Sequence, residues 1–123
     1  MSQLLSLLKI DRAVYYDIVI REGDSSPLLL EFYDDDGNEV DISDYSFMLE
    51  ARKQSKQLLS DISFTSQEGD FIQYSTNSLL WNLDGNKTRG KEGSYTYYFG
   101  LVDNLNNSST VIYGKFTVIN KEG

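Results

Sequence analysis

Residues 93–103, with the sequence GSYTYYFGLVD, place a large apolar or aromatic side chain at every second position. Successive side chains of a β-strand point to opposite faces, so this spacing predicts a strand with one buried face. Residues 110–119 repeat the pattern, and the polar run 104–109 between them predicts a long antiparallel hairpin. The predicted buried face of this hairpin carries Tyr95, Tyr97, Phe99, Leu101, Ile112, Phe116 and Val118.

The same alternation recurs over residues 14–21, 28–34 and 45–52, and more weakly over residues 58–65 and 70–76. Residues 66–69 contain a glycine and predict a hairpin between the two weaker strands. About seven strands without helical segments between them predict an all-β fold, an antiparallel β-sandwich spanning residues 13–120. The predicted inward side chains of the three clearer segments are Val14, Tyr16, Ile18, Ile20, Leu28, Leu30, Phe32, Phe47, Leu49 and Ala51.

The N-terminal residues 1–12 form a separate apolar extension in this interpretation. Leu4, Leu5 and Leu8 fall on one side of a possible short helix over residues 2–9. A helix of that length is marginal in isolation, so its leucines need a surface to cover. Two arrangements satisfy this need: the leucines cover an open end of the domain's own core, or they dock onto another subunit.

The composition excludes several classes of function. The chain has 123 residues, 19 acidic and 11 basic side chains, a net charge of −8, and neither cysteine nor histidine. The length fits one domain. Without cysteine or histidine there is no thiolate nucleophile, no imidazole base and no ordinary zinc site, so we expect a protein that is not an enzyme and has no cofactor.

The acidic balance also bears on partners. A chain with a pI near 4.4 repels nucleic acids and anionic membrane surfaces. The N-terminal residues lack a basic region and a cleavage site, and no segment reaches the ~20 apolar residues of a membrane span. We therefore expect a soluble product made inside the cell, with no nucleic-acid or membrane partner.

Residues 34–44 contain six acidic side chains. A calcium loop would use several carboxylates of this kind, and the candidates for its ligands are Asp34, Asp36 and Asn38. The spacing differs from that of an EF-hand, because Gly37 comes fourth rather than sixth and Tyr45 occupies the twelfth position. A solvated hairpin turn centred on Gly37 is the favoured interpretation.

Two further features have a functional and a plain interpretation. Residues 84–93 hold three glycines and three basic side chains, but the run leads into a strand rather than a helix, which favours a flexible loop between sheets over a phosphate site.

The nine tyrosines suggest an interaction surface, with Tyr15, Tyr33 and Tyr98 predicted to face outward. An alternative function is a carbohydrate-binding module that stacks a cell-surface glycan on Tyr98, Tyr33 or Trp81.

Three stretches in order carry a resemblance to a known family. Residues 17–24 are a strand that ends in a glycine step, and residues 28–45 join a strand to an acidic Asp-Gly turn and a VDISDY step. The third stretch is GSYTY at 93–97 followed by GKFTV at 114–118. Over residues 14–119 they resemble the immunoglobulin-like domain at the N-terminus of phage baseplate upper proteins and related tailed-phage virion structural proteins.

The resemblance implies an immunoglobulin-like sandwich in a structural protein of the virion, made in the host cytoplasm. Its expected role is an adaptor or decoration module at the tail, baseplate or fibre attachment. Such a module would dock in many copies to other virion proteins. The leucine-rich residues 1–11 depart from the family's plain loop at this position. The docking candidates are Leu4, Leu5, Leu8, Tyr15, Tyr33 and Tyr98.

Overall fold

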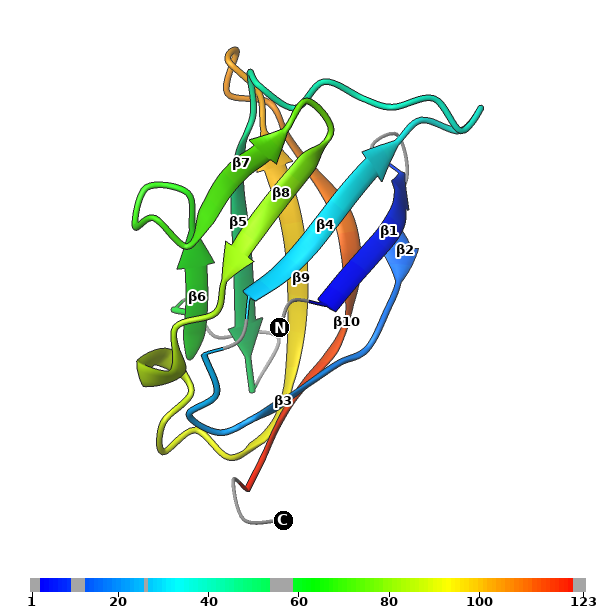
Figure 1. The fold of residues 1–123 in the computed structure, drawn as a ribbon. Coiled ribbons are helices and arrows are strands. Elements are labelled where there is room, and N and C mark those ends of the chain that lie inside the picture. Colours follow the sequence, from blue (N-terminus) through cyan, green and yellow to red (C-terminus); the bar gives the residue numbers. More distant parts are fainter. Residues whose placement is uncertain (1–2, 10–12, 26, 54–58, 121–123) are drawn as a thin grey trace.

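The protein is a sandwich of two β-sheets (Figure 1). The computed structural model describes residues 3–9, 13–25, 27–53 and 59–120; for residues 3–9 it describes the backbone. One sheet has the strand order β1-β4-β8-β7, and the other has the order β2-β10-β9-β5-β6, with β3 also paired to β10. The all-β sandwich predicted from the alternation is confirmed.

Ten strands lie in the described residues, rather than about seven. The helical part described is a single 3₁₀ turn, η1 (Gly85–Lys87), and none of the described residues forms a helix long and apolar enough to cross a membrane. The strands are β1 (Gln3–Lys9), β2 (Val14–Tyr15), β3 (Ile18–Arg21), β4 (Pro27–Tyr33), β5 (Ser46–Arg52), β6 (Ile62–Thr65), β7 (Phe71–Ser75), β8 (Ser78–Asn82), β9 (Gly93–Val102) and β10 (Ser108–Ile119).

The core lies between the sheets and is rich in aromatic rings. Phe99 of β9 is at its centre, with its ring centroid 5.8 Å from that of Phe47, 5.4 Å from Phe71 and 6.4 Å from Phe32. These rings come from both sheets, so their packing holds the two layers together. The predicted inward faces of β4, β5 and β9 and of the hairpin partner β10 are confirmed, because their side chains are buried or pack against the buried core.

The N-terminal segment is a strand, so the short helix considered for residues 2–9 is wrong. β1 pairs in parallel with β4, placing Leu4 opposite Leu29, Leu5 opposite Leu30 and Leu8 opposite Phe32. An isolated helix of this length would be marginal, whereas a strand gains hydrogen-bond partners along the edge of β4. Residues 1, 2 and 10–12 of the predicted extension lie outside the described residues, as do the leucine side chains of β1.

The predicted strand over residues 14–21 is broken into β2 and β3, both parallel to β10. At the break, the backbone N–H of Tyr16 donates to the carbonyl of Tyr113 at 2.8 Å, and the side chain of Asp17 accepts from the N–H of Lys115 at 2.9 Å. Ile18 and Ile20 are buried as predicted, but Val14 and Tyr16 are exposed, so the burial predicted for these two is wrong. Val14 is in register with the buried Ile112, and β2, which carries it, is at the edge of the sheet.

The predicted hairpin over residues 66–69 is a crossing between sheets. β6 pairs with β5 in one sheet, and β7 pairs with β8 in the other. Gly69 adopts a φ of 82° in this turn, which a glycine accepts without strain. The true hairpin partner of β7 is β8, which the alternation did not reveal. Leu58, the first residue of the predicted strand 58–65, lies outside the described residues.

Candidate docking surface

Three tyrosines stand side by side on the outer face of the larger sheet. Tyr15 of β2 is in register with Tyr113 of β10, and Tyr113 is in register with Tyr98 of β9. We call Tyr15, Tyr113 and Tyr98 the tyrosine row. Their neighbours Ile112, Tyr97 and Phe99 are buried, so alternation along β9 and β10 directs the tyrosines outward.

The tyrosine row is accessible at one end and restrained at the other. Tyr15 is 55% exposed and Tyr113 is 44% exposed, and their ring centroids lie 5.5 Å apart with the planes nearly perpendicular. Tyr98 is partly buried, and its hydroxyl donates to the Glu50 carboxylate. The row therefore offers fixed aromatic surface, which costs little conformational entropy when a partner binds.

Glu50 of β5 continues the tyrosine row, since it is in register with Tyr98. Its carboxylate also accepts from the Ser60 hydroxyl at 3.0 Å and pairs with Arg52 at 3.4 Å. Partial burial opposes the ionised form, but the hydrogen bonds from Tyr98 and Ser60 and the charge of Arg52 lower the pKa of Glu50. The Arg52 guanidinium carbon lies 5.7 Å from the centroid of the Tyr98 ring.

The hydroxyls of Tyr15 and Tyr98, at the two ends of the tyrosine row, stay protonated at neutral pH. The hydrogen bond to Glu50 and partial burial raise the pKa of Tyr98. A side-chain hydrogen bond to Asp17 is the main cause that raises the pKa of Tyr15. An uncharged aromatic surface with fixed hydroxyls is suited to contact with another protein, where tyrosine is enriched.

The other predicted docking residues lie elsewhere. Tyr33 is in β4 of the smaller sheet, and its hydroxyl donates to Glu31 at 3.1 Å. Leu4, Leu5 and Leu8 are in β1 at the edge of that same sheet. The structure thus brings Tyr15 and Tyr98 together and separates them from the remaining candidates, and their roles in docking stay predictions.

Tyr113, which lies between Tyr15 and Tyr98 in the row, was not among the tyrosines predicted to face outward. Its signal was present in the predicted hairpin, because Ile112 and Phe116 were placed inward and alternation then directs Tyr113 outward. The pairing of β10 with β2 had no signal of that kind, since the two segments are far apart in the sequence.

The acidic run 34–44 contains a turn held by its own carboxylate. Asp34 Oδ1 accepts from the backbone N–H groups of Asp36 and Asn38, both at 2.9 Å, and Gly37 has a φ of 86°. This is the polar turn that the sequence favoured. In the described parts of the chain there is no group of three or more His, Cys, Asp or Glu side chains that could hold a metal ion.

Residues 84–93 form the predicted loop between the sheets, since they lead from β8 of the smaller sheet to β9 of the larger one, and hydrogen bonds anchor the loop to the rest of the molecule. Asp84 caps η1 by accepting from the N–H of Asn86 at 3.0 Å. Thr88 is fully buried, and its hydroxyl oxygen accepts from the N–H of Gly23 at 3.0 Å. Gly85 lies so close to the backbone of Gly23 that a Cβ atom would come within 2.2 Å of its carbonyl oxygen.

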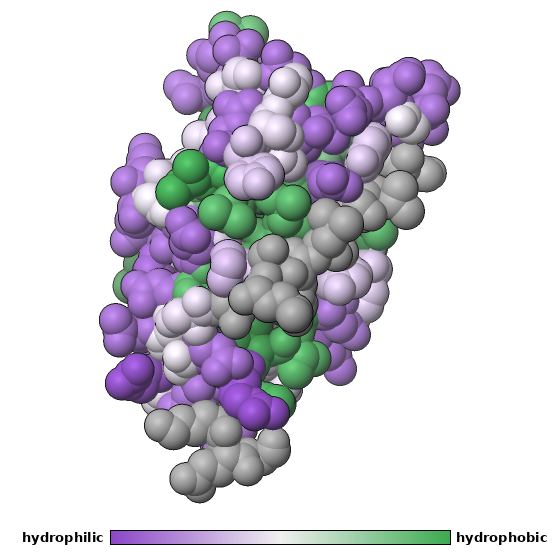
Figure 2. All heavy atoms as spheres, in the orientation of Figure 1, coloured by the Kyte–Doolittle hydropathy of each residue, from purple (hydrophilic) through white to green (hydrophobic). Residues whose placement is uncertain are grey.

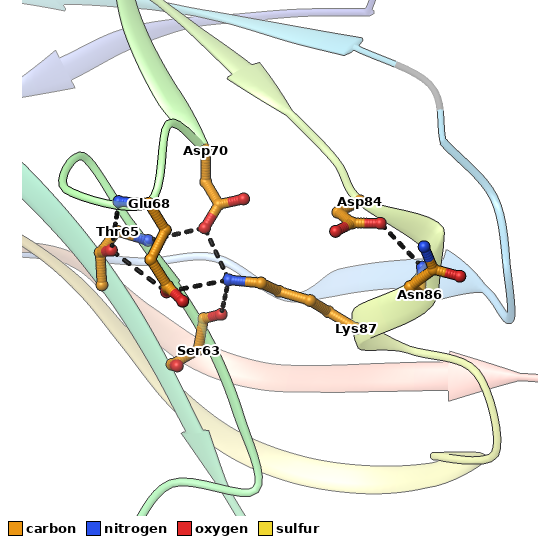
Figure 3. Close-up of polar contacts among 7 residues, drawn as sticks. All are labelled: Ser63, Thr65, Glu68, Asp70, Asp84, Asn86 and Lys87. Carbon is orange, nitrogen blue, oxygen red and sulfur yellow. Dashed lines mark hydrogen bonds and ion pairs between the residues drawn. The ribbon is translucent and has the colours of Figure 1, made fainter.

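Lys87 of this loop donates a hydrogen bond to the backbone of β6 at the edge of the larger sheet (Figure 3). Its ammonium group lies 2.9 Å from the carbonyl oxygen of Ser63, 2.7 Å from Asp70 and 3.0 Å from Glu68. The Asp70 carboxylate also accepts from the N–H of Thr65 at 3.0 Å. Desolvation alone would lower the pKa of Lys87, but the bonds to Asp70 and Glu68 outweigh it and raise the pKa.

Trp81, a candidate for stacking a glycan, is 2% exposed and lies in the core between Phe64 and Phe71. A buried ring cannot stack on a sugar at the surface, so this part of the carbohydrate hypothesis is wrong. Its indole N–H is buried and has no hydrogen-bond partner among the described residues. Tyr33 and Tyr98 are partly buried, and both have hydroxyls engaged with carboxylates.

No protein-family profile matches this sequence. No curated protein matches it. Its fold is similar to a solved structure, the N-terminal domain of phage TP901-1 ORF48, with a TM-score of 0.59 and 9% sequence identity. The similarity covers 96% of this chain and 98% of that chain, so it extends over the whole sandwich. At this identity the likeness shows a common fold.

Proposed function

We propose that the protein is a structural component of a tailed-phage virion, an adaptor or decoration module at the tail, baseplate or fibre attachment that acts by docking to other virion proteins. The observation that carries the proposal is the fold similarity to a phage domain over nearly the full length of both chains. The ordered sequence stretches that resemble baseplate upper proteins support it independently. Localisation to the virion and assembly in many copies follow from this role.

The tyrosine row supplies the contact chemistry that the proposal requires. Exposed aromatic side chains on a rigid sheet bury large area with little loss of freedom, and weak contacts repeated around a particle add up. Tyr15 and Tyr113 are the accessible members, so they carry the expected docking contact.

The test uses tailed particles released from cells that encode this chain. We expect antibodies against the purified chain to label these particles in electron microscopy, and mass spectrometry to find the chain in fractions purified by density gradient. Particles that contain every tail protein but not this chain would refute the proposal.

A double variant, Tyr15→Ser with Tyr113→Ser, tests the tyrosine row within the same particles. We expect at least about tenfold lower incorporation, because central aromatic side chains dominate the affinity of protein interfaces. The matched control is Leu105→Ser, which removes an exposed apolar side chain from the loop between β9 and β10. Equal incorporation of all three proteins would show that the tyrosine row is not the contact.

A further inference from the structure

The outer face of the smaller sheet carries a second exposed surface, formed by apolar side chains in one register. Ile72 of β7 is opposite Leu80 of β8, and Leu80 is opposite Leu29 of β4. We call Ile72, Leu80 and Leu29 the apolar row. Ile72 is 50% exposed, and Tyr74 further along β7 is 68% exposed. Figure 2 shows hydrophobic side chains gathered over this part of the sheet.

The apolar row ends at β7, which is an edge strand of its sheet. β6, the edge strand of the larger sheet, differs in this respect. There, Lys87 donates to the Ser63 carbonyl and Asp70 accepts from the Thr65 N–H, so these backbone groups already have partners. At β7 the amide of Gln73 donates to the carbonyl of Ser75 at 3.0 Å, at the end of the strand. An edge strand flanked by exposed apolar side chains is a template for pairing with another strand.

β4, β7 and β8, the three strands that carry the apolar row, hold one charged side chain, and Lys9 is in β1 at the opposite edge of the sheet from β7. β4, β7 and β8 together contain Glu31 and no lysine or arginine, whereas the larger sheet carries Arg21, Arg52 and Lys115. The acidic run 34–44 lies beside β7, because Ile42 N–H donates to the Thr76 carbonyl at 2.9 Å and the Gln73 amide donates to the Ser43 hydroxyl at 3.3 Å. A partner with basic side chains would therefore be attracted, and a second copy with its own charge of −8 would be repelled.

We propose that β7 and the apolar row bind an extended segment of another virion protein, in which lysine or arginine side chains flank apolar ones. The segment adds a strand to the edge of β7, its apolar side chains cover Ile72 and Tyr74, and its basic side chains face the acidic run. This inference rests on the proposed function, because it assumes that the chain docks to other proteins of the particle.

The first test is incorporation of the double variant Ile72→Lys with Tyr74→Lys into particles. Both side chains are exposed, so the fold should persist, while lost apolar area and added positive charge should lower incorporation at least about tenfold. Leu105→Lys is the matched control and should incorporate like the unchanged chain. Absence of the unchanged chain from particles would refute the proposed function, whereas normal incorporation of the double variant would refute only the role of β7.

The second test uses a defined probe, a synthetic ten-residue peptide of alternating lysine and valine, added to the full ¹⁵N-labelled chain. We expect amide shifts on residues 71–76 and in the acidic run, weakened by added salt because the attraction is between charges. A peptide with glutamate in place of lysine should leave these signals unchanged. Shifts confined to the larger sheet, or equal shifts with both peptides, would overturn the proposal.

Discussion

Lys87 carries the most constrained positive charge among the described side chains. Its ammonium group meets two carboxylates and a backbone carbonyl, and it lies 5.3 Å from the centroid of the Phe64 ring. The sequence showed a basic residue in a glycine-rich loop and nothing of this arrangement, because Asp70 and Ser63 come from other strands. The charge serves the fold by satisfying groups at the edge of β6.

Replacing Lys87 by methionine should destabilise the protein by roughly 2–4 kcal/mol, because the buried Asp70 carboxylate would lose its countercharge. Chemical denaturation followed by circular dichroism measures this change. The control Lys91→Met removes an exposed lysine of the same loop and should change stability by less than about 0.5 kcal/mol. Equal stability of both variants would show that the Lys87 cluster is not stabilising.

Glu50 gives the stability of the protein a predictable dependence on pH. Its pKa is lower in the folded chain than its ordinary value of 4.5, so the folded state binds this proton less readily than the unfolded state does. The contribution is present above about pH 4.5 and is lost as the pH falls through the lowered pKa.

The variant Glu50→Gln should therefore show a smaller loss of unfolding free energy between neutral and acidic pH than the unchanged chain. Denaturant titrations at a series of pH values measure the slope. Glu92→Gln removes one exposed carboxylate from another part of the surface and controls for the change in net charge. An unchanged slope in Glu50→Gln would contradict the network around Tyr98.

The strands β4, β5 and β9 show what alternation predicts well. Each has one face in the core and one toward solvent, and the buried side chains follow the spacing of two. β8 was missed because Leu79, Leu80 and Trp81 form a continuous apolar run, with Leu79 and Trp81 buried and Leu80 only partly covered. The break between β2 and β3 was not predicted for a different reason: it depends on contacts with β10, which a local pattern of alternation does not show.

The loop that contains η1 is an element fixed by close backbone approach. Replacing Gly85 by alanine would drive its Cβ against the carbonyl of Gly23, so we expect a loss of about 1–3 kcal/mol from overpacking. Thermal unfolding measures the loss. The neighbouring exposed Asn86→Ala should stay within about 0.5 kcal/mol of the unchanged protein. A Gly85→Ala variant as stable as Asn86→Ala would show that the loop can move away from Gly23.

At the scale of the whole molecule, the fold class could be predicted and the sheet membership could not. Alternation is a local signal, so it predicts a strand without showing its neighbours. Residues 66–69 illustrate the limit, because the same glycine turn fits a hairpin and a crossing between sheets. The candidate site shares this limit: two of the three tyrosines in the row were predicted to face outward, but their adjacency arises from the pairing of β2, β10 and β9.

The pairing of β1 with β4 also predicts how the whole molecule responds to truncation. Removing residues 1–10 would leave β4 unpaired on one side, and an open edge of this kind promotes association between chains. We expect the truncated protein to self-associate more than the full chain at equal concentration in size-exclusion chromatography with light scattering. Adding a synthetic peptide of residues 1–10 should reverse the association. A truncated protein that elutes as the full chain does would show that β1 does not protect β4.

The position of β10 has a consequence for the synthesis of the chain. β2 and β3 pair with β10, and the contact between Asp17 and Lys115 joins residues separated by 98 positions. A nascent chain on the ribosome therefore carries β2 and β3 without their sheet partner until β10 has left the exit tunnel. Contacts of such long sequence separation also slow folding. The larger sheet, with the tyrosine row upon it, is consequently complete only after β10 has left the ribosome.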